Sequence, residues 1–148
     1  MTMHKSMGHY LFIFVLGYIG ISILVGLIGL LFSTSMSAMT VLVPFLAASF
    51  AGERFLKIEK RLPSDTERSM LTNASFLIFA GINILLIGLA ALLGVFGETE
   101  GLGSTIFIII GGFLVFIFLI AYLMIRWAYG SLLNKRADKF AKNDTTFD

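Results

Sequence analysis

The sequence predicts an all-α, polytopic membrane protein with four transmembrane helices, paired as two antiparallel hairpins, and with both termini in the cytoplasm. Hydrophobic residues make up 57% of the chain and charged residues only 14%, whereas a soluble domain carries about 25% charged residues. The mean hydropathy is +0.93, and the apolar residues occur in runs of roughly 20, the length that crosses a bilayer as a helix. Nine charged residues fall between positions 53 and 68. They separate two apolar runs before this segment from two apolar runs after it.

Each apolar run is expected to be a helix, because lipid offers no hydrogen-bond partner to irregular backbone. The first run is longer than the apolar part of a signal peptide, so we expect a retained signal anchor. The expected single domain covers residues 1–148, with spans at 8–32, 36–52, 70–96 and 105–127, a charged connection at 53–69 and a basic tail at 128–148.

The orientation follows from lysine and arginine, which are retained on the cytoplasmic side of short flanking segments. The segment before the first span, the central connection and the tail all contain basic residues, whereas the turns at 33–35 and 97–103 contain none. We therefore expect both termini and the central connection to face the cytoplasm, with the acidic turn of Glu98 and Glu100 outside. Tyr10, Trp127 and Tyr129 fall near the cytoplasmic boundary and are expected to anchor there as an aromatic belt.

The central connection is expected to extend the second helix beyond the membrane. Glu53, Lys57 and Arg61 recur every four residues and would share one helix face, until Pro63 ends the helix. Ser64 and Glu67 match a capping box, which predicts that the third helix starts in the cytoplasm. The predicted charged cytoplasmic face contains Glu53, Arg54, Lys57, Arg61, Glu67 and Arg68. The basic tail is expected either to lie as a helix on anionic lipid or to be a solvated helix end.

Small residues indicate where helices touch, because lipid gives no hydrophobic drive for helix association. The first two spans each carry a small-residue stripe, and we expect these stripes to face each other. Pro44, in the second stripe, removes one backbone hydrogen bond and favours a kink, as a structural feature or a hinge. The stripes comprise Ser22, Gly26, Gly29 and Ser33 in and just after the first span, and Ser37, Thr40, Pro44, Ala47 and Ala51 in the second.

The third span has the most polar face. Asn83 lies deep in the span, so its amide needs a partner. The partner is expected on another helix of the bundle, such as Thr40 or Tyr122, on a second protein or a second copy, or in a ligand or ion. Ala74, Gly81 and Gly88 form a separate stripe at heptad spacing. The predicted helix-contact or partner residues are Ser22, Gly26, Gly29, Thr40, Pro44, Asn73, Gly81, Asn83, Gly88 and Tyr122.

Several chemistries are not expected. The chain has no cysteine, and hence no thiolate nucleophile or cysteine-ligated metal. No acid or histidine lies in the middle of a span, where proton-coupled transport usually places one. Gly-rich phosphate loops and the GxSxG and HExxH patterns are missing. We therefore expect no enzyme, cofactor or metal site, and no nucleic-acid binding, because the basic residues lie beside the spans.

The central segment resembles a family of short, uncharacterised four-helix bacterial inner-membrane proteins. The resemblance is carried by Phe50-Ala51 and Phe55, then Arg61-Leu62-Pro63-Ser64 and Glu67-Arg68, with Ser75 and Asn83 further on. It implies a fold and a location, but no activity. Small multidrug exporters are disfavoured because the first span lacks their glutamate, and fluoride channels because their Gly-Asn and Phe-box patterns are missing.

Two functional hypotheses remain. The first is a non-enzymatic protein that binds another membrane protein through intramembrane helix faces, as an accessory subunit or as an immunity protein against a pore-forming toxin. Small four-helix proteins with little mass outside the bilayer are similar in architecture to several such immunity proteins. The alternative is a small homo-oligomeric channel or carrier, with a pore lined by Ser37, Thr40, Asn73 and Asn83.

Overall fold

The computed structural model describes residues 7–32, 37–94 and 104–144, and every regular element in these ranges is a helix, which confirms the all-α class. Side chains are not described at 32, 37–41, 104–107, 140 and 143–144. The predicted turns at 33–35 and 97–103 and the last residues of the tail therefore lie outside the described part. The elements are α1 (Met7–Phe32), α2 (Ser37–Glu59), α3 (Asp65–Leu92), α4 (Ser104–Trp127), η1 (Ala128–Leu132) and α5 (Leu133–Asp144).

Three helical segments in the described part are long and apolar enough to cross a membrane: Met7–Leu31, Asp65–Leu92 and Ile108–Lys139. These correspond to the expected first, third and fourth spans. The expected second span belongs to α2, which is not among the three. Glu53, Arg54, Lys57 and Glu59 crowd into the C-terminal end of α2, so the apolar part of this helix is short.

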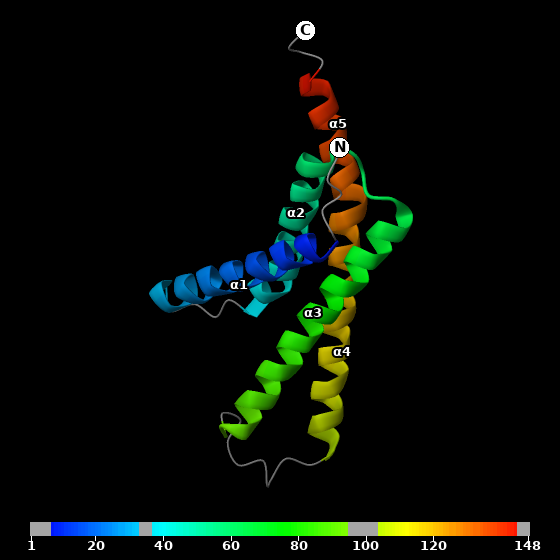
Figure 1. Ribbon diagram of the computed structural model, residues 1–148. Coiled ribbons are helices and arrows are strands. Elements are labelled where there is room, and N and C mark those ends of the chain that lie inside the picture. The colour runs from blue at the N-terminus through cyan, green and yellow to red at the C-terminus, as the bar shows by residue number, and fades with distance from the viewer. Residues whose placement is uncertain (1–6, 33–36, 95–103, 145–148) are drawn as a thin grey trace.

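The helices form two pairs that meet at one end (Figure 1). α4, η1 and α5 run on without interruption as one long rod, and α3 passes obliquely beside it. α2 lies against the upper part of this rod, and α1 crosses α2 and extends away from the rod. The far end of α1 therefore points away from the far ends of α3 and α4, and much of their apolar surface is exposed.

The buried core lies where the two pairs meet. Tyr10, Phe14 and Tyr18 recur every four residues along α1, so they form one face, and all three are buried. Tyr10 packs on Phe55 of α2 with ring centroids 4.9 Å apart, and Tyr18 meets Phe79 of α3 edge to face at 5.8 Å. Aromatic side chains from three helices thus hold the crossing together.

The small residues of α2 lie in this interface, but those of α1 lie elsewhere than expected. Pro44, Ala47 and Ala51 are buried, and the close approach on α1 is at Gly17, where an added Cβ would lie 3.6 Å from the Ala47 Cα. Gly26 is exposed, and nothing would lie within 4 Å of its Cβ. The expected contact through Gly26 is therefore wrong, because the contact face of α1 is aromatic and turns Gly26 outward.

The connection between α2 and α3 confirms the predicted capping box. The Glu67 amide donates to the Ser64 hydroxyl at 3.3 Å, and the Ser64 amide donates to the Glu67 carboxylate at 2.8 Å. The end of α2 differs from expectation, because the helix stops at Glu59 and Lys60 takes the left-handed conformation, with φ 50°. The helix therefore ends at Glu59, three residues earlier than the position that Pro63 predicts. Arg61 lies beyond the helix and so does not share a helix face with Glu53 and Lys57.

The π-helical segment η1 was not predicted. A π-helix has a wider turn than an α-helix and therefore rotates the residues that follow it. Ala128, Tyr129 and Gly130 are buried, and Leu133 at the start of α5 packs on α2, with its Cδ1 3.3 Å from where a Cβ of Gly52 would lie. Ala128, Tyr129, Gly130 and Leu133 are thus part of the folded core, whereas Asn134, Lys135, Asp138 and Lys139 further along the tail are exposed. For this exposed part of the tail, a solvated helix end and a helix lying on lipid both stay predictions.

The close approach at Gly17 gives a first prediction. Gly17→Leu should destabilise the protein by about 1–3 kcal/mol, because the larger side chain overpacks against the backbone at Ala47. Gly20→Leu is the matched control, since a Cβ there meets nothing within 4 Å. Thermal unfolding of both variants in mild detergent measures the difference, and equal stabilities would contradict the packing at Gly17.

Candidate functional site

Asn83 forms hydrogen bonds within the molecule. Its side-chain nitrogen donates to the Tyr18 hydroxyl on α1 at 2.9 Å and to the Phe79 carbonyl at 2.8 Å. Ser22 is a further hydrogen-bond partner of the Tyr18 hydroxyl. The sequence suggests Tyr122 or Thr40 as helix partners of Asn83, but the structure pairs Asn83 with Tyr18, an aromatic residue outside the small-residue stripe of α1.

Asn73 and Tyr122 meet at a different interface, between α3 and α4. The Tyr122 hydroxyl lies 3.5 Å from the Asn73 side-chain oxygen, toward which it donates. Asn73 is exposed, and the Tyr122 ring also packs edge to face on Phe76, with centroids 5.3 Å apart. The two asparagines of α3 therefore serve two separate contacts and do not converge on one site. The side chain of Thr40, the other candidate in this group, lies outside the described part.

Tyr129 is buried, although the sequence predicts that it lies at the membrane interface. Its predicted role as an interfacial anchor is wrong, because it is fully buried and its hydroxyl lies 3.0 Å from the Ser75 hydroxyl. Tyr10 is likewise buried, and it donates to the Glu59 carboxylate at 2.9 Å. Trp127 differs from both, being half exposed and stacked on Phe45 with centroids 5.4 Å apart.

The charged face is divided among three ion-pair groups. Glu53 accepts from Lys57 at 3.1 Å and from Arg136 of α5 at 2.6 Å. Arg61 instead binds Glu67 with two hydrogen bonds of 2.7 Å, and its guanidinium lies 5.3 Å from the centre of the Phe55 ring. Hydrogen bonding to Glu67 raises the pKa of Arg61. The Glu53 pair with Arg136 links α2 to α5, and the Arg61 pair links the connection after α2 to α3.

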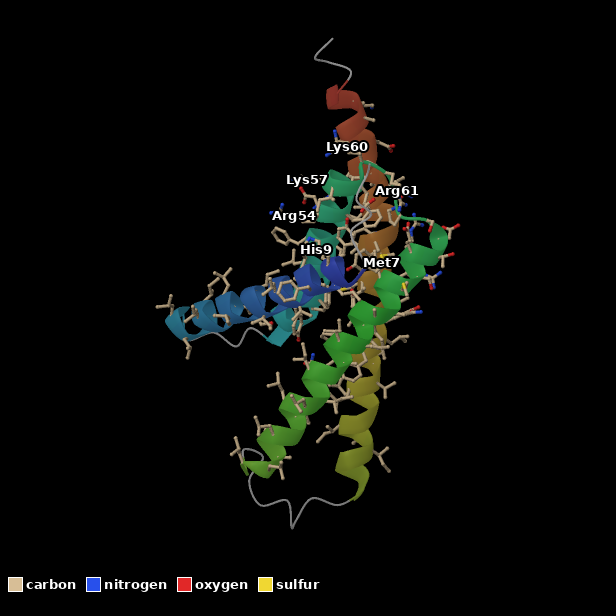
Figure 2. The ribbon with its side chains drawn as sticks, in the orientation of Figure 1. Met7, His9, Arg54, Lys57, Lys60 and Arg61 are labelled. Atoms are coloured by element: carbon tan, nitrogen blue, oxygen red, sulfur yellow. The ribbon has the colours of Figure 1, made fainter. Side chains whose placement is uncertain are left out.

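Arg68 belongs to the third group, in which it donates to Asn134 at 3.3 Å and lies 3.9 Å from Asp65. Arg54 is exposed and, with His9, lines a separate hollow between α1 and α2. Figure 2 shows Arg54, Lys57, Lys60 and Arg61 gathered around the end of α2, close to the start of α1. In the described part of the chain, no three His, Asp or Glu residues come together in a way that could hold a metal ion.

The stripe of α3 that contains Gly81 and Gly88 remains open. Both glycines are exposed, and a Cβ added at either would meet nothing within 4 Å. Gly29 of α1 is only partly exposed, and Gly26 beside it is open. The predicted contact residues therefore separate into those used by the fold, such as Pro44 and Asn83, and those that face outward.

The buried hydroxyl pair gives a second prediction. Ser75→Ala and Tyr129→Phe should each destabilise the protein by about 1–3 kcal/mol, because each leaves one buried hydroxyl without a partner. The double variant should lose less than the sum of the two losses, since both partners are then gone. A double-mutant cycle of unfolding free energies in detergent measures the coupling, and strict additivity would contradict the hydrogen bond.

Comparison with known proteins adds no assignment, because no family model, curated protein or solved structure matches this chain. The resemblance to short four-helix inner-membrane proteins stays a prediction, and any function has to be argued from the geometry.

Proposed function

We propose that this chain is a non-enzymatic integral protein of the bacterial inner membrane, which binds another membrane protein through an outward face of α3. It would act as an accessory subunit or as an immunity protein against a membrane-inserted toxin. The observation that carries this proposal is a stripe of alternating small and large apolar residues on α3 that is exposed, except at the partly covered Ala74, in the described structure.

This outer stripe of α3 is Ala74, Leu77, Gly81, Ile84 and Gly88. The residues follow steps of three and four, so they lie on one face of the helix. Leu77 is 69% exposed and Ile84 is 60% exposed, while Gly81 and Gly88 leave open space beside the backbone. A partner helix could approach closely at the glycines and insert side chains between the larger residues, which is how helices associate in lipid.

The polar contacts count against a pore within a single copy of the chain. The expected pore residues Asn73 and Asn83 make hydrogen bonds to different helices, α4 and α1 respectively. A water-filled pore within one copy would need such groups to line a common path. Asn83 is instead satisfied by Tyr18 and by its own helix, and its amide supports the α1–α3 contact.

The proposed membrane placement has four spans with both termini in the cytoplasm. Three apolar segments are long enough to cross the membrane, and the apolar part of α2, which follows α1, supplies the fourth crossing. The basic residues around the end of α2 (Figure 2) then lie on the cytoplasmic side, where lysine and arginine are retained.

The partner face gives a third prediction. The double variant Gly81→Leu/Gly88→Leu should lose its membrane-protein partner, because the leucines fill the space that the partner helix needs. The variant itself should fold normally, since both positions are open in the isolated chain. Copurification from the native membrane, combined with photocrosslinking from position 84, measures partner recovery.

The matched control for this experiment is Gly20→Leu, which adds the same bulk at an open position of α1. It should retain the partner. Loss of the partner from the control as well, or recovery of the protein alone from native membranes, would contradict the proposal. Solute flux in proteoliposomes above that of empty vesicles, abolished by Asn83→Leu, would instead favour the channel.

The membrane placement gives a fourth prediction. The chain has no cysteine, so a single introduced cysteine reports the side on which it lies. In spheroplasts, Thr66→Cys should resist a membrane-impermeant maleimide, whereas Thr99→Cys should react. Reaction at Thr66→Cys without lysis would contradict a cytoplasmic central connection.

A further inference from the structure

A cavity of about 570 Å³ lies between α3 and the rod formed by α4 and η1, on a part of the molecule that the proposed partner stripe does not use. Its volume is within the range of roughly 300–1,000 Å³ in which proteins hold small ligands. The π-helical segment contributes part of the wall, and such segments often occur at functional sites. Polar groups that line it include Arg68, Thr72, Arg126 and Ser131.

Two residues of this lining each have a buried polar atom without a hydrogen-bond partner among the described residues: Arg68 at Nε and Thr72 at Oγ1. Thr72 is only 3% exposed. Buried polar atoms in folded proteins normally have a hydrogen-bond partner, so an unpaired one indicates a partner that is absent from the chain itself. Arg68 Nε can only donate, and a threonine hydroxyl can donate as well as accept. A ligand that supplies hydrogen-bond acceptors would satisfy both atoms.

The charges of the cavity favour an anionic ligand. Two guanidinium groups, Arg68 and Arg126, line the cavity with a single carboxylate, Asp65. The Asp65 side chain is fully exposed to solvent and lies 3.9 Å from the nearest nitrogen of Arg68, so it neutralises Arg68 weakly. Asn134 holds another nitrogen of this guanidinium at 3.3 Å, which fixes the group in place while leaving Nε–H to donate.

The position of the cavity points to the headgroup layer of a membrane. It lies where the apolar stretch of α3 begins and that of α4 ends, and the exposed side chains of Leu123 and Trp127 border it. Tryptophan is enriched at the depth of lipid headgroups. At that depth, the anion with several acceptor oxygens that meets a protein is the phosphate of a phospholipid, which arginine binds well.

We propose that this cavity binds an anionic phosphate group, with Arg68 and Arg126 supplying the charge and the Thr72 hydroxyl donating to a phosphate oxygen. The phosphate belongs to a phospholipid headgroup or to free inorganic phosphate, and the two sources share this chemistry. The inference does not depend on the partner stripe of α3.

Trp127 makes the test direct, because it is the single tryptophan of the chain and lines the cavity. The full-length protein in detergent is titrated with short-chain phosphatidylglycerol, with short-chain phosphatidylcholine and with inorganic phosphate, and Trp127 fluorescence is followed. Phosphatidylglycerol should give a saturable change, and the zwitterionic phosphatidylcholine should bind more weakly. Competition by inorganic phosphate identifies free phosphate as a ligand, whereas saturation by phosphatidylglycerol alone identifies the lipid.

Matched variants locate the site. Thr72→Val and Arg126→Gln should each weaken binding at least about tenfold, the effect of losing a hydrogen bond to a charged group. Thr72→Ser, which keeps the hydroxyl, and Arg54→Gln, which removes the same charge on α2, should bind as the parent does. The proposal is overturned if no ligand gives a saturable change, if Thr72→Val binds normally, or if Arg54→Gln weakens binding as much as Arg126→Gln.

Discussion

Tyr129 is the side chain on which the meeting of the helices depends. It lies in η1, its hydroxyl is 3.0 Å from Ser75 of α3, and its ring edge would be 3.5 Å from a Cβ on Gly52 of α2. One side chain therefore contacts both helices that flank the charged connection. Apolar burial does not drive helix association in lipid, so buried hydrogen bonds and close packing at small residues contribute much of the stabilisation.

The charged groups reinforce this meeting point from outside. Glu53 bonds to Arg136 on α5, and Arg61 bonds to Glu67 on α3. A paired arginine and carboxylate with two parallel hydrogen bonds fixes direction as well as distance. The capping box at Ser64 uses the same Glu67, so the start of α3 and the end of α2 are set together. The opposite ends of α1, α3 and α4 have no comparable connection among the described residues.

The surfaces that remain available for binding are those that these contacts do not use. Residues packed at the meeting point, such as the partly buried Asn83 and the buried Pro44, are occupied by the fold itself. The glycines of the outer stripe of α3 and the unpaired Thr72 hydroxyl are not occupied. The first is a surface where a helix can approach, and the second is a polar group in a cavity, so the two proposals rest on separate observations.

Composition and periodicity by themselves determined the all-α class, the positions of the three long apolar helices and the capping box at Ser64, because these follow from local physics: hydropathy over one helix length and hydrogen bonds between near neighbours. The end of α3 was not determined in this way, since the third span was expected to reach residue 96 and the helix ends at Leu92. Only the tertiary structure decided that Tyr18 pairs with Asn83, that Gly17 and not Gly26 meets Ala47, and that Tyr129 is buried. These contacts join residues that are far apart in the sequence. They depend on helix crossing and on the rotation introduced by η1, which the pattern of small residues along each single helix does not contain.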